Sequence, residues 1–444
     1  MNANMPAESS GKPVQTSGTL PAELTSFAAR KEARARELAA KFKAELPPAV
    51  WAYFTAATRG SWPEVERLGE EVRNLPAPPE NRRPGPAVVS QVWAGVMETY
   101  MAFAQFALGE PKYAFAFARG IIQSIPPGSI YFGGTDAGRG LVTALCRSHE
   151  TGDPFFTLTQ NALVDRTYLR YLREIYSGSI FTPSDDDLRQ AIDEYSRDLE
   201  RRRKENRLIP GEKVERVDGK VQLTGQISAM AVNGAMARLI FDRNPGREFF
   251  VEESFPLDWM YPHLVPHGFI LAIAREPLPA VPPERVEEDR RFWQERLGQM
   301  LGDWLRPETP LSEVCAFAEK VFLRQDLAGF AGDPKYVASA PACQNFSKLR
   351  RSIAGLYSWR ARNDPDPAGQ RRMAEAAEFA FRQAFALDPR SPGAVFGLAQ
   401  HLLGERRPAD AFLAAETASK MAPENSQVQS LTRWLAPKDR KEQR

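Results

Sequence analysis

The spacing of apolar positions predicts helices in the first part of the chain. From residue 23 to residue 125, apolar residues recur every three or four positions, as they do on one face of a helix. Short breaks, among them Gly60 and Gly109, divide this region into antiparallel helices. Residues 1–22 are rich in Ser, Pro, Gly and Thr and offer little to bury, which predicts a disordered tail. We therefore expect an N-terminal helical domain at 23–125.

The pattern changes at residue 126, where β-branched and aromatic runs begin to alternate with helices. Strands are expected in SIYFGG, PFFTLTQNA, REFFVEES and GFILAIARE, and a hairpin is expected to turn at Asp218-Gly219. This alternation predicts a central three-layer α/β domain of about four strands over 126–278. A Pro-rich linker at 279–285 then leads to a C-terminal helical domain at 286–444. The predicted fold class is therefore α/β plus α, a small α/β domain flanked by helical hairpins.

A repeat of 34 residues can be counted near the C-terminus. The positions that recur around FAFRQAFALDPRS and FLAAETASKMAPEN are Ala377 and Ala411, Ala380 and Ala414, Ala384 and Ala418, Leu387 and Met421, and Pro389 and Pro423. This is the period of tetratricopeptide repeats, and small alanines allow two helices of a hairpin to approach closely. The sequence predicts tetratricopeptide-like hairpins here, with an ordinary alanine-rich bundle as the alternative.

Composition and charge exclude several classes of function. The 58 Lys and Arg nearly balance the 56 Asp and Glu, so bulk charge gives no attraction to nucleic acid or anionic lipid. Cys146, Cys315 and Cys343 lie far apart and suit neither a disulfide framework nor a zinc site. The N-terminus has no signal-peptide pattern, and no window approaches the ~20 apolar residues of a membrane span. We expect a soluble, cytoplasmic protein that binds no nucleic acid.

The stretch IYFGGTDAGRG is the first candidate for chemistry. It fits G-x-x-x-x-G, but Arg139 and Gly140 stand where a nucleotide-binding loop needs Lys and Ser or Thr. A tight turn from strand to helix, capped by Asp136 or Thr135, is the simpler interpretation. Ligands nevertheless bind at strand ends in open α/β sheets. The ligand-binding candidates there are Thr135, Asp136, Arg139 and Asn161, together with Gln160. Arg139 suits an anion, and Asn161 suits a hydroxyl group, as in sugar recognition.

No other motif indicates catalysis or a cofactor. His263 and His267 have the spacing of two metal ligands on a helix, but Pro262 and Pro266 predict a loop there, and no nearby Cys or Glu completes a set. The sequence contains neither a Ser, His and Asp order nor a G-x-S-x-G elbow. We therefore predict no metal, no cofactor and a non-enzymatic role, with an enzyme as the alternative.

Four stretches between residues 129 and 275 occur in an order that resembles a known family. They are SIYFGGTDAG, FFTLTQNALVDRTYLRYL, LIFDRNPGREFFVEES and MYPHLVPHGFILAIARE. The order is similar to that in the soluble C-terminal region of bacterial multi-pass membrane proteins resembling protein O-mannosyltransferases. The positions that fit are Asp136, Asn161, Asn244, Arg247, Phe249, Tyr261, Leu264 and Gly268, while Pro245 and Gly246 interrupt the family's N-x-x-R join.

The resemblance implies an α/β part followed by tetratricopeptide-like helices, a stand-alone version of an accessory soluble region. In such proteins sugar transfer is expected in the membrane half, which has no counterpart in these residues, so the resemblance assigns no catalytic residue. It also implies an extracytoplasmic location as the alternative to the cytoplasm.

Two functions follow from these observations. The first is a non-enzymatic interaction protein whose tetratricopeptide-like helices dock a partner protein, as an accessory to a membrane glycosyltransferase. Its candidate anchors are Trp293, Trp304 and Trp359 in the C-terminal helical region, for which burial in the core is the alternative. The second is an enzyme that binds a sugar or nucleotide sugar at the strand ends near Asp136.

Overall fold

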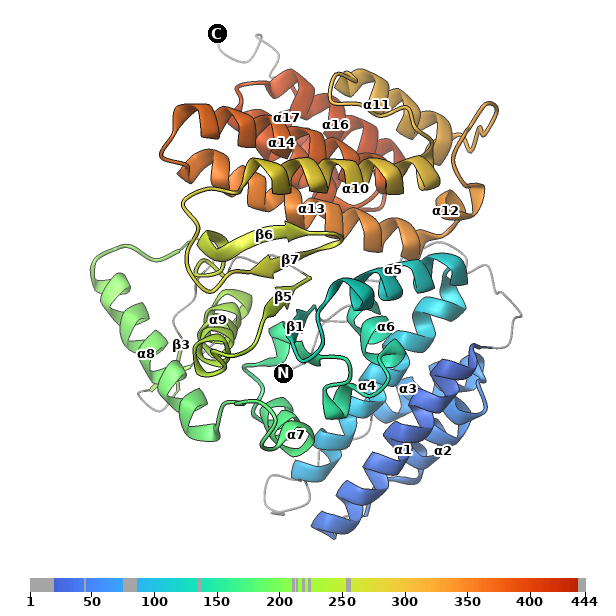
Figure 1. Ribbon diagram of the computed structural model, residues 1–444, viewed down its shortest axis with the longest axis vertical. Coiled ribbons are helices and arrows are strands. Elements are labelled where there is room, and N and C mark those ends of the chain that lie inside the picture. Colours follow the sequence, from blue (N-terminus) through green and yellow to red (C-terminus); the bar gives the residue numbers. More distant parts are fainter. Residues whose placement is uncertain are drawn as a thin grey trace. The chain divides into compact units, whose positions relative to one another are not determined.

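The computed structural model describes residues 20–43, 45–74, 86–134, 137–209, 212, 215–217, 220–222, 225–252 and 257–437, without the side chains of 86–91, 137–139, 215–217 and 220–222. This part of the chain is mainly helical, with seventeen α-helices (Figure 1). Its strands form one small mixed sheet in the order β2-β1-β5-β7-β6 and a separate pair, β3-β4. The predicted combination of helices with a small sheet is confirmed, whereas the three-layer arrangement and the tetratricopeptide repeats stay predictions. None of the described helices is long and apolar enough to cross a membrane.

The chain divides into two compact units that alternate along the sequence. Unit 1 comprises Met1–Leu108, Ile121–Phe250 and Pro256–Met260, and unit 2 comprises Gly109–Gly120, Val251–Phe255 and Tyr261–Arg444. Both units take residues from more than one of the domains predicted from the sequence.

Unit 1 contains the first helices and the parallel strands. Its helices are α1 (Ala22–Phe42), α2 (Pro48–Thr58), α3 (Trp62–Arg73), α4 (Pro86–Leu108), α6 (Ala137–Leu145), α7 (Arg166–Tyr176), α8 (Asp185–Lys204) and α9 (Gly225–Arg243), with 3₁₀ turns η1 (His149–Thr151) and η2 (Gln160–Ala162). Its strands are β1 (Ile130–Gly133), β2 (Phe156–Thr159), β3 (Glu215–Val217) and β4 (Lys220–Gln222). The strands β1 and β2 are parallel, and β3 pairs with β4 in the predicted antiparallel hairpin. A unit boundary falls within α5 (Pro111–Ser124) and within β5 (Phe249–Val251).

Unit 2 contains a β-hairpin and the C-terminal helices. Its helices are α10 (Pro283–Leu301), α11 (Leu311–Ala318), α12 (Pro334–Ala338), α13 (Ala340–Asn363), α14 (Pro367–Leu387), α15 (Pro392–Gly404), α16 (Pro408–Met421) and α17 (Ser426–Leu435), with short turns η3 (Tyr261–His263) and η4 (Glu319–Leu323). The hairpin consists of β6 (Leu264–His267) and β7 (Ile270–Ile273). The sequence predicted a loop where β6 lies, and that prediction is wrong. Because β6 is at the end of the strand order, its Pro266 can be accommodated without a ladder N–H.

Tyrosines of α7 complete the hydrogen bonding of β2 along its outer edge. The N–H of Phe156 donates to Ser129 O beside β1, so the N–H groups of the alternate residues point away from β1. The N–H of Thr157 donates to the hydroxyl of Tyr176 at 3.2 Å, and that hydroxyl donates to Thr157 O at 2.9 Å. Further along β2, the N–H of Thr159 donates to the hydroxyl of Tyr168 at 2.6 Å. These contacts fix α7 against the strand.

Gly140, the last residue of IYFGGTDAGRG, allows α6 to pack closely on α4. A Cβ atom at this position would lie 2.8 Å from Cβ of Met101 and 2.9 Å from the backbone N of Ala102. Such distances are shorter than real Cβ atoms tolerate, and the backbone atom cannot be moved by a change of rotamer. The absence of a side chain at Gly140 therefore has a packing role in unit 1.

We expect Gly140→Ala to lower the free energy of unfolding by about 1–3 kcal/mol, because the added methyl group overpacks the contact between α4 and α6. Urea denaturation followed by circular dichroism measures the change. Gly404→Ala is the matched control, since no described atom lies within 4 Å of a Cβ built at Gly404, near the end of α15. Equal stability of the two variants would contradict the close approach of α6 to α4.

Candidate functional site

The ligand-binding residues predicted from the sequence lie at the carboxyl ends of β1 and β2. Thr135 and Asp136 lie outside the described residues, and Arg139 lies in α6 with its side chain outside the description. Asn161 lies in η2, directly after β2, and is half-buried. Because β1 and β2 pair in parallel, their carboxyl ends meet at one edge. The structure thus brings Asn161 to the edge where the glycine-containing segment begins.

Buried polar atoms gather in the segment that follows β2. Gln160 is only 2% exposed, and both atoms of its side-chain amide are buried without a hydrogen-bond partner among the described residues. Oγ1 of Thr159 and Oδ1 of Asn161 are buried in the same state. The sequence placed Gln160 at this edge, but it gave no indication that its side chain would be buried.

The three tryptophans proposed as partner anchors lie in or near the core of unit 2. Trp293 is completely buried, so it belongs to that core. Trp304 is half-buried and its ring lies 4.3 Å from that of Phe317, centroid to centroid. Trp359 is half-buried and is stacked on Tyr261 at 5.5 Å with an interplanar angle of 16°. The well-exposed aromatic side chains of unit 2 lie elsewhere, on α15 and α17.

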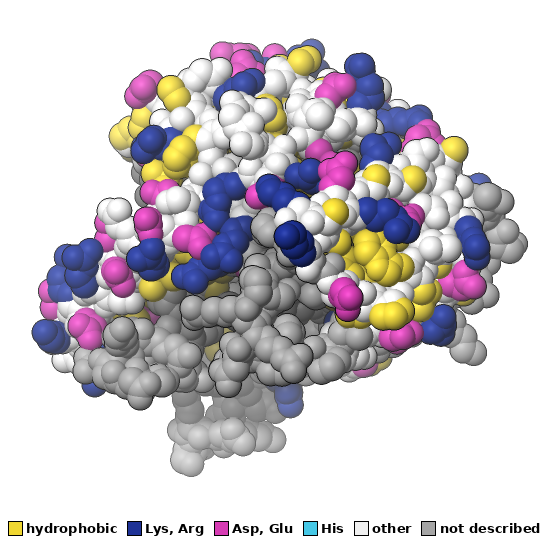
Figure 2. Space-filling view, turned by 90° about the horizontal axis from the view of Figure 1, so that it is seen from below, with side chains coloured by type: hydrophobic (Ala, Val, Ile, Leu, Met, Phe, Trp, Pro, Cys, Tyr) yellow, Lys and Arg dark blue, Asp and Glu magenta, His cyan; other side chains and the backbone are white. Residues whose placement is uncertain are grey.

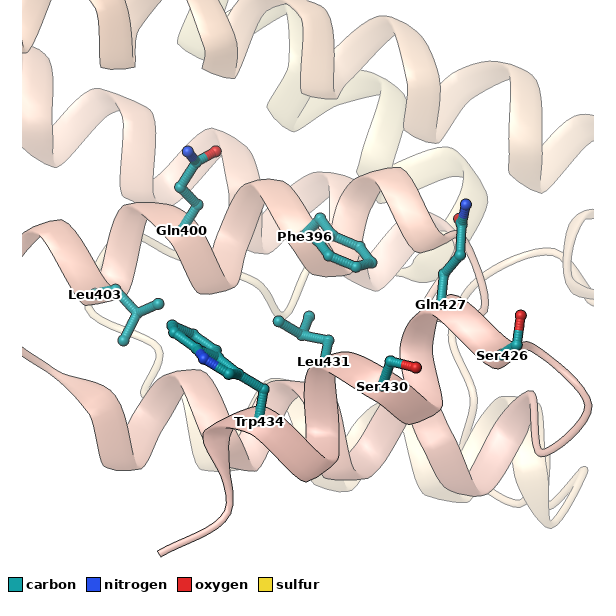
Figure 3. A pocket seen from close by; sticks show the side chains of 8 residues that line it. All are labelled: Phe396, Gln400, Leu403, Ser426, Gln427, Ser430, Leu431 and Trp434. Atoms are coloured by element: carbon teal, nitrogen blue, oxygen red, sulfur yellow. The ribbon is translucent and has the colours of Figure 1, made fainter. Parts of the chain in front are cut away.

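A groove of about 850 Å³ lies between α15 and α17 (Figure 3). Its lining consists of Phe396, Gln400 and Leu403 from α15 and of Ser426, Gln427, Ser430, Leu431 and Trp434 from α17. The apolar members of this set point toward one another across the gap between the two helices, and none of the eight lining residues is charged (Figure 3). We call this feature the α15/α17 groove.

Helical spacing explains why these side chains share a face. Phe396, Gln400 and Leu403 are separated by four and then three positions, which places them along one side of α15. On α17, Val428 is completely buried, and Trp434 lies six positions later, about 240° around the helix. Trp434 is therefore 68% exposed, and Phe396 is 41% exposed. The offset from Val428 is a signal that the sequence interpretation missed.

Unit 1 contains a second constellation that the sequence interpretation missed, centred on the ammonium group of Lys31. Nζ of Lys31 lies 2.8 Å from Oε2 of Glu98 and 2.8 Å from Nε2 of His149. It lies 3.0 Å from Oε1 of Glu150 and 2.7 Å from the hydroxyl of Tyr171. The side chains of Lys31 and Glu98 are 2% and 3% exposed. We call these five residues the Lys31 cluster.

The donors and acceptors of the Lys31 cluster are matched. An ammonium group only donates, so Nε2 of His149 accepts and the ring proton lies on Nδ1. Burial raises the pKa of Tyr171 well above its ordinary value, and the nearby carboxylates of Glu98 and Glu150 act in the same direction. The hydroxyl therefore stays protonated and donates to Oε2 of Glu98 at 3.1 Å. With its donors and acceptors matched, the cluster serves to join α1, α4, η1 and α7.

The sequence did contain a signal for Lys31. It lies on the apolar stripe of α1 with Leu24, Phe27 and Leu38, which are all buried, so a charged residue stands at a core position. Its partners are far away in the chain, since His149 is separated from Lys31 by 118 positions. Periodicity can indicate the buried lysine but not what neutralises it.

Neither a metal site nor a surface of one charge is evident in the described part of the chain. There, no group of three or more His, Cys, Asp or Glu residues could hold a metal ion. His263 is buried and its Nδ1 lies 2.8 Å from Ala274 O. On the face shown in Figure 2, Lys and Arg side chains lie among Asp and Glu side chains.

We expect Lys31→Met to lower the free energy of unfolding by about 3–5 kcal/mol, because it leaves Glu98 buried without its counter-ion. Adding Glu98→Gln should recover part of this loss. Lys41→Met is the control, since Lys41 pairs with Glu174 on the surface and such pairs contribute less than about 1 kcal/mol. Urea denaturation at neutral pH measures all four proteins, and equal losses for Lys31→Met and Lys41→Met would show that the Lys31 cluster is not required for stability.

Comparison with known proteins gives no relative from which a role could be transferred. The chain matches no protein-family model and no curated protein. The resemblance to the soluble region of O-mannosyltransferase-like proteins therefore stays an expectation from the quoted motifs. Functional conclusions have to come from the α15/α17 groove and from the strand ends of unit 1.

Proposed function

We propose that this protein is a docking module that binds a segment of a partner protein in the α15/α17 groove. One observation carries the proposal, namely the exposure of Trp434 at an uncharged groove lined by further apolar side chains. Large aromatic side chains that meet an apolar pocket are the groups that contribute most to protein binding. Their exposure in the free protein leaves apolar surface that a partner would remove from water.

The lining also defines the chemistry of the partner segment. Phe396, Leu403, Leu431 and Trp434 would contact aliphatic or aromatic side chains, and the absence of charge in the lining disfavours an acidic or basic segment. Three hydroxyl and amide types of side chain at the rim suit the backbone N–H and C=O groups of a peptide. We infer that the occupant is an apolar, uncharged segment of another protein.

The positions of the 34-residue repeat support a tetratricopeptide-like arrangement around the groove. The alanines of the repeat are completely buried in both copies, and they are Ala377, Ala380 and Ala384 in α14 and Ala411, Ala414 and Ala418 in α16. Leu387 ends α14 and Met421 ends α16, while α15 begins at Pro392 and α17 begins at Ser426, so each pair keeps the same offset. On this proposal α15 and α17 are equivalent helices of successive hairpins.

The nature of the partner is a finer proposal. The resemblance found in the sequence favours a membrane glycosyltransferase, for which this protein would be an accessory. No feature of the groove depends on that choice, so the identity of the partner and the place where it binds can be tested separately.

A photo-crosslinking amino acid at Leu403 should capture one specific protein in cells that express the chain. The same group at Ile209, which is exposed in unit 1, should not capture it. With that protein purified, Trp434→Ala should weaken binding about 30-fold, the loss of roughly 2 kcal/mol expected for an aromatic anchor. Isothermal titration calorimetry measures the affinity.

Ile209→Ala is the matched control for Trp434→Ala, because both residues are large, apolar and more than half exposed. Both variants should keep the melting temperature of the wild type. A crosslinked protein that binds Trp434→Ala as tightly as the wild type would place docking outside the groove. A captured protein other than a glycosyltransferase would retain the docking proposal and reject the finer one.

A further inference from the structure

We propose that unit 1 contains a binding site for a neutral, hydroxyl-bearing ligand in the segment Thr159–Asn161. The site lies at the carboxyl end of β2 and is independent of the docking proposal, which concerns unit 2. Four buried side-chain atoms of these residues, without partners among the described residues, carry the inference.

The backbone around the segment is held in place by side chains distant in sequence. The N–H of Thr159 donates to the hydroxyl of Tyr168 at 2.6 Å, and the N–H of Val164 donates to Oδ1 of Asn233 at 2.7 Å. Nδ2 of Asn233 in turn donates to the carbonyl oxygen of Asn161 at 3.1 Å. The conformation of the segment is therefore fixed before any ligand binds, which is what a pre-organised site requires.

The side chains of the same segment contrast with its backbone. Both amide atoms of Gln160, Oγ1 of Thr159 and Oδ1 of Asn161 are buried without a hydrogen-bond partner among the described residues. Folded proteins pair the large majority of their buried polar side-chain atoms, because an unpaired one is costly. Four such atoms in three consecutive residues indicate that a group from outside the chain completes their hydrogen bonds.

The types of these atoms select the ligand. Oε1 of Gln160 and Oδ1 of Asn161 only accept, so their partner has to donate, and Nε2 of Gln160 needs an acceptor. Phosphate and carboxylate groups only accept when ionised, and they would leave both oxygens unpaired. A hydroxyl group donates and accepts at once, so neighbouring hydroxyls of a sugar or polyol meet both requirements.

The position of the segment also suits ligand binding. Ligands of open α/β sheets bind at the carboxyl ends of the strands, and β1 and β2 end together at this edge. Gln160 is buried, whereas its neighbour Asn161 is half-buried. Asn161 would therefore lie on the solvent side of the site and Gln160 at its inner end.

The test compares the wild type with Gln160→Leu, which removes the amide but keeps a side chain of similar size. D-glucose, D-galactose and D-mannose are the probes, each added to the full-length protein. Sugars stabilise any protein by exclusion from its surface, so the informative quantity is the difference between the melting-temperature shifts of the two proteins. A probe well above its Kd should raise the melting temperature of the wild type by several degrees more than that of Gln160→Leu.

Gln190→Leu is the matched control, because Gln190 is exposed on α8 and its amide donates to Glu194. This variant should respond to the sugars as the wild type does. Without sugar, Gln160→Leu should be at least as stable as the wild type, since it removes an unpaired buried amide. Thr159→Val, a change of similar shape, gives a second test if Gln160→Leu fails to fold.

Equal shifts of the wild type, Gln160→Leu and Thr159→Val with all three sugars would overturn the proposal and leave water as the partner of these atoms. A larger shift for the wild type with one sugar, matched by a calorimetric Kd that Gln160→Leu weakens at least tenfold, is the expected result.

Discussion

A lysine ammonium group that leaves water must find acceptors on every side, and unit 1 is arranged around this requirement at Lys31. Its acceptors come from α4, η1 and α7, so these elements are held at fixed positions around α1. Tyr171 is the acceptor in α7, and Tyr168 and Tyr176 of the same helix bind the outer edge of β2. A residue near the start of the chain thus helps to position the strand end that we propose as a ligand site.

The fold could be predicted where its cause is local. The segment SIYFGG predicts a strand from its own composition, and β1 (Ile130–Gly133) lies there. The segment around Pro266 was predicted as a loop, because a proline interrupts a central strand. Whether a strand lies at the centre or at the end of a sheet is a property of the tertiary structure, so no local rule could place β6 correctly.

The candidate sites show the same limit. The end of β2 could be predicted as a polar site, because the rule that ligands bind at strand ends needs only the order of strands and helices. The buried state of Gln160 could not, since it depends on Tyr168 and Asn233 from α7 and α9. Trp293 and Trp434 are alike as residues, yet one is in the core and the other is 68% exposed. Only the packing of their helices distinguishes them.

The tyrosine hydroxyls along β2 have a consequence for how other chains can approach. An exposed edge strand offers unpaired N–H and C=O groups to which a strand from another molecule can add, and such addition leads either to recognition or to aggregation. In β2 the outward N–H groups of Thr157 and Thr159 are already bonded to Tyr176 and Tyr168. An incoming strand would have to displace both hydroxyls and push α7 aside. This edge is therefore closed to β-augmentation, which protects unit 1 from intermolecular sheet formation.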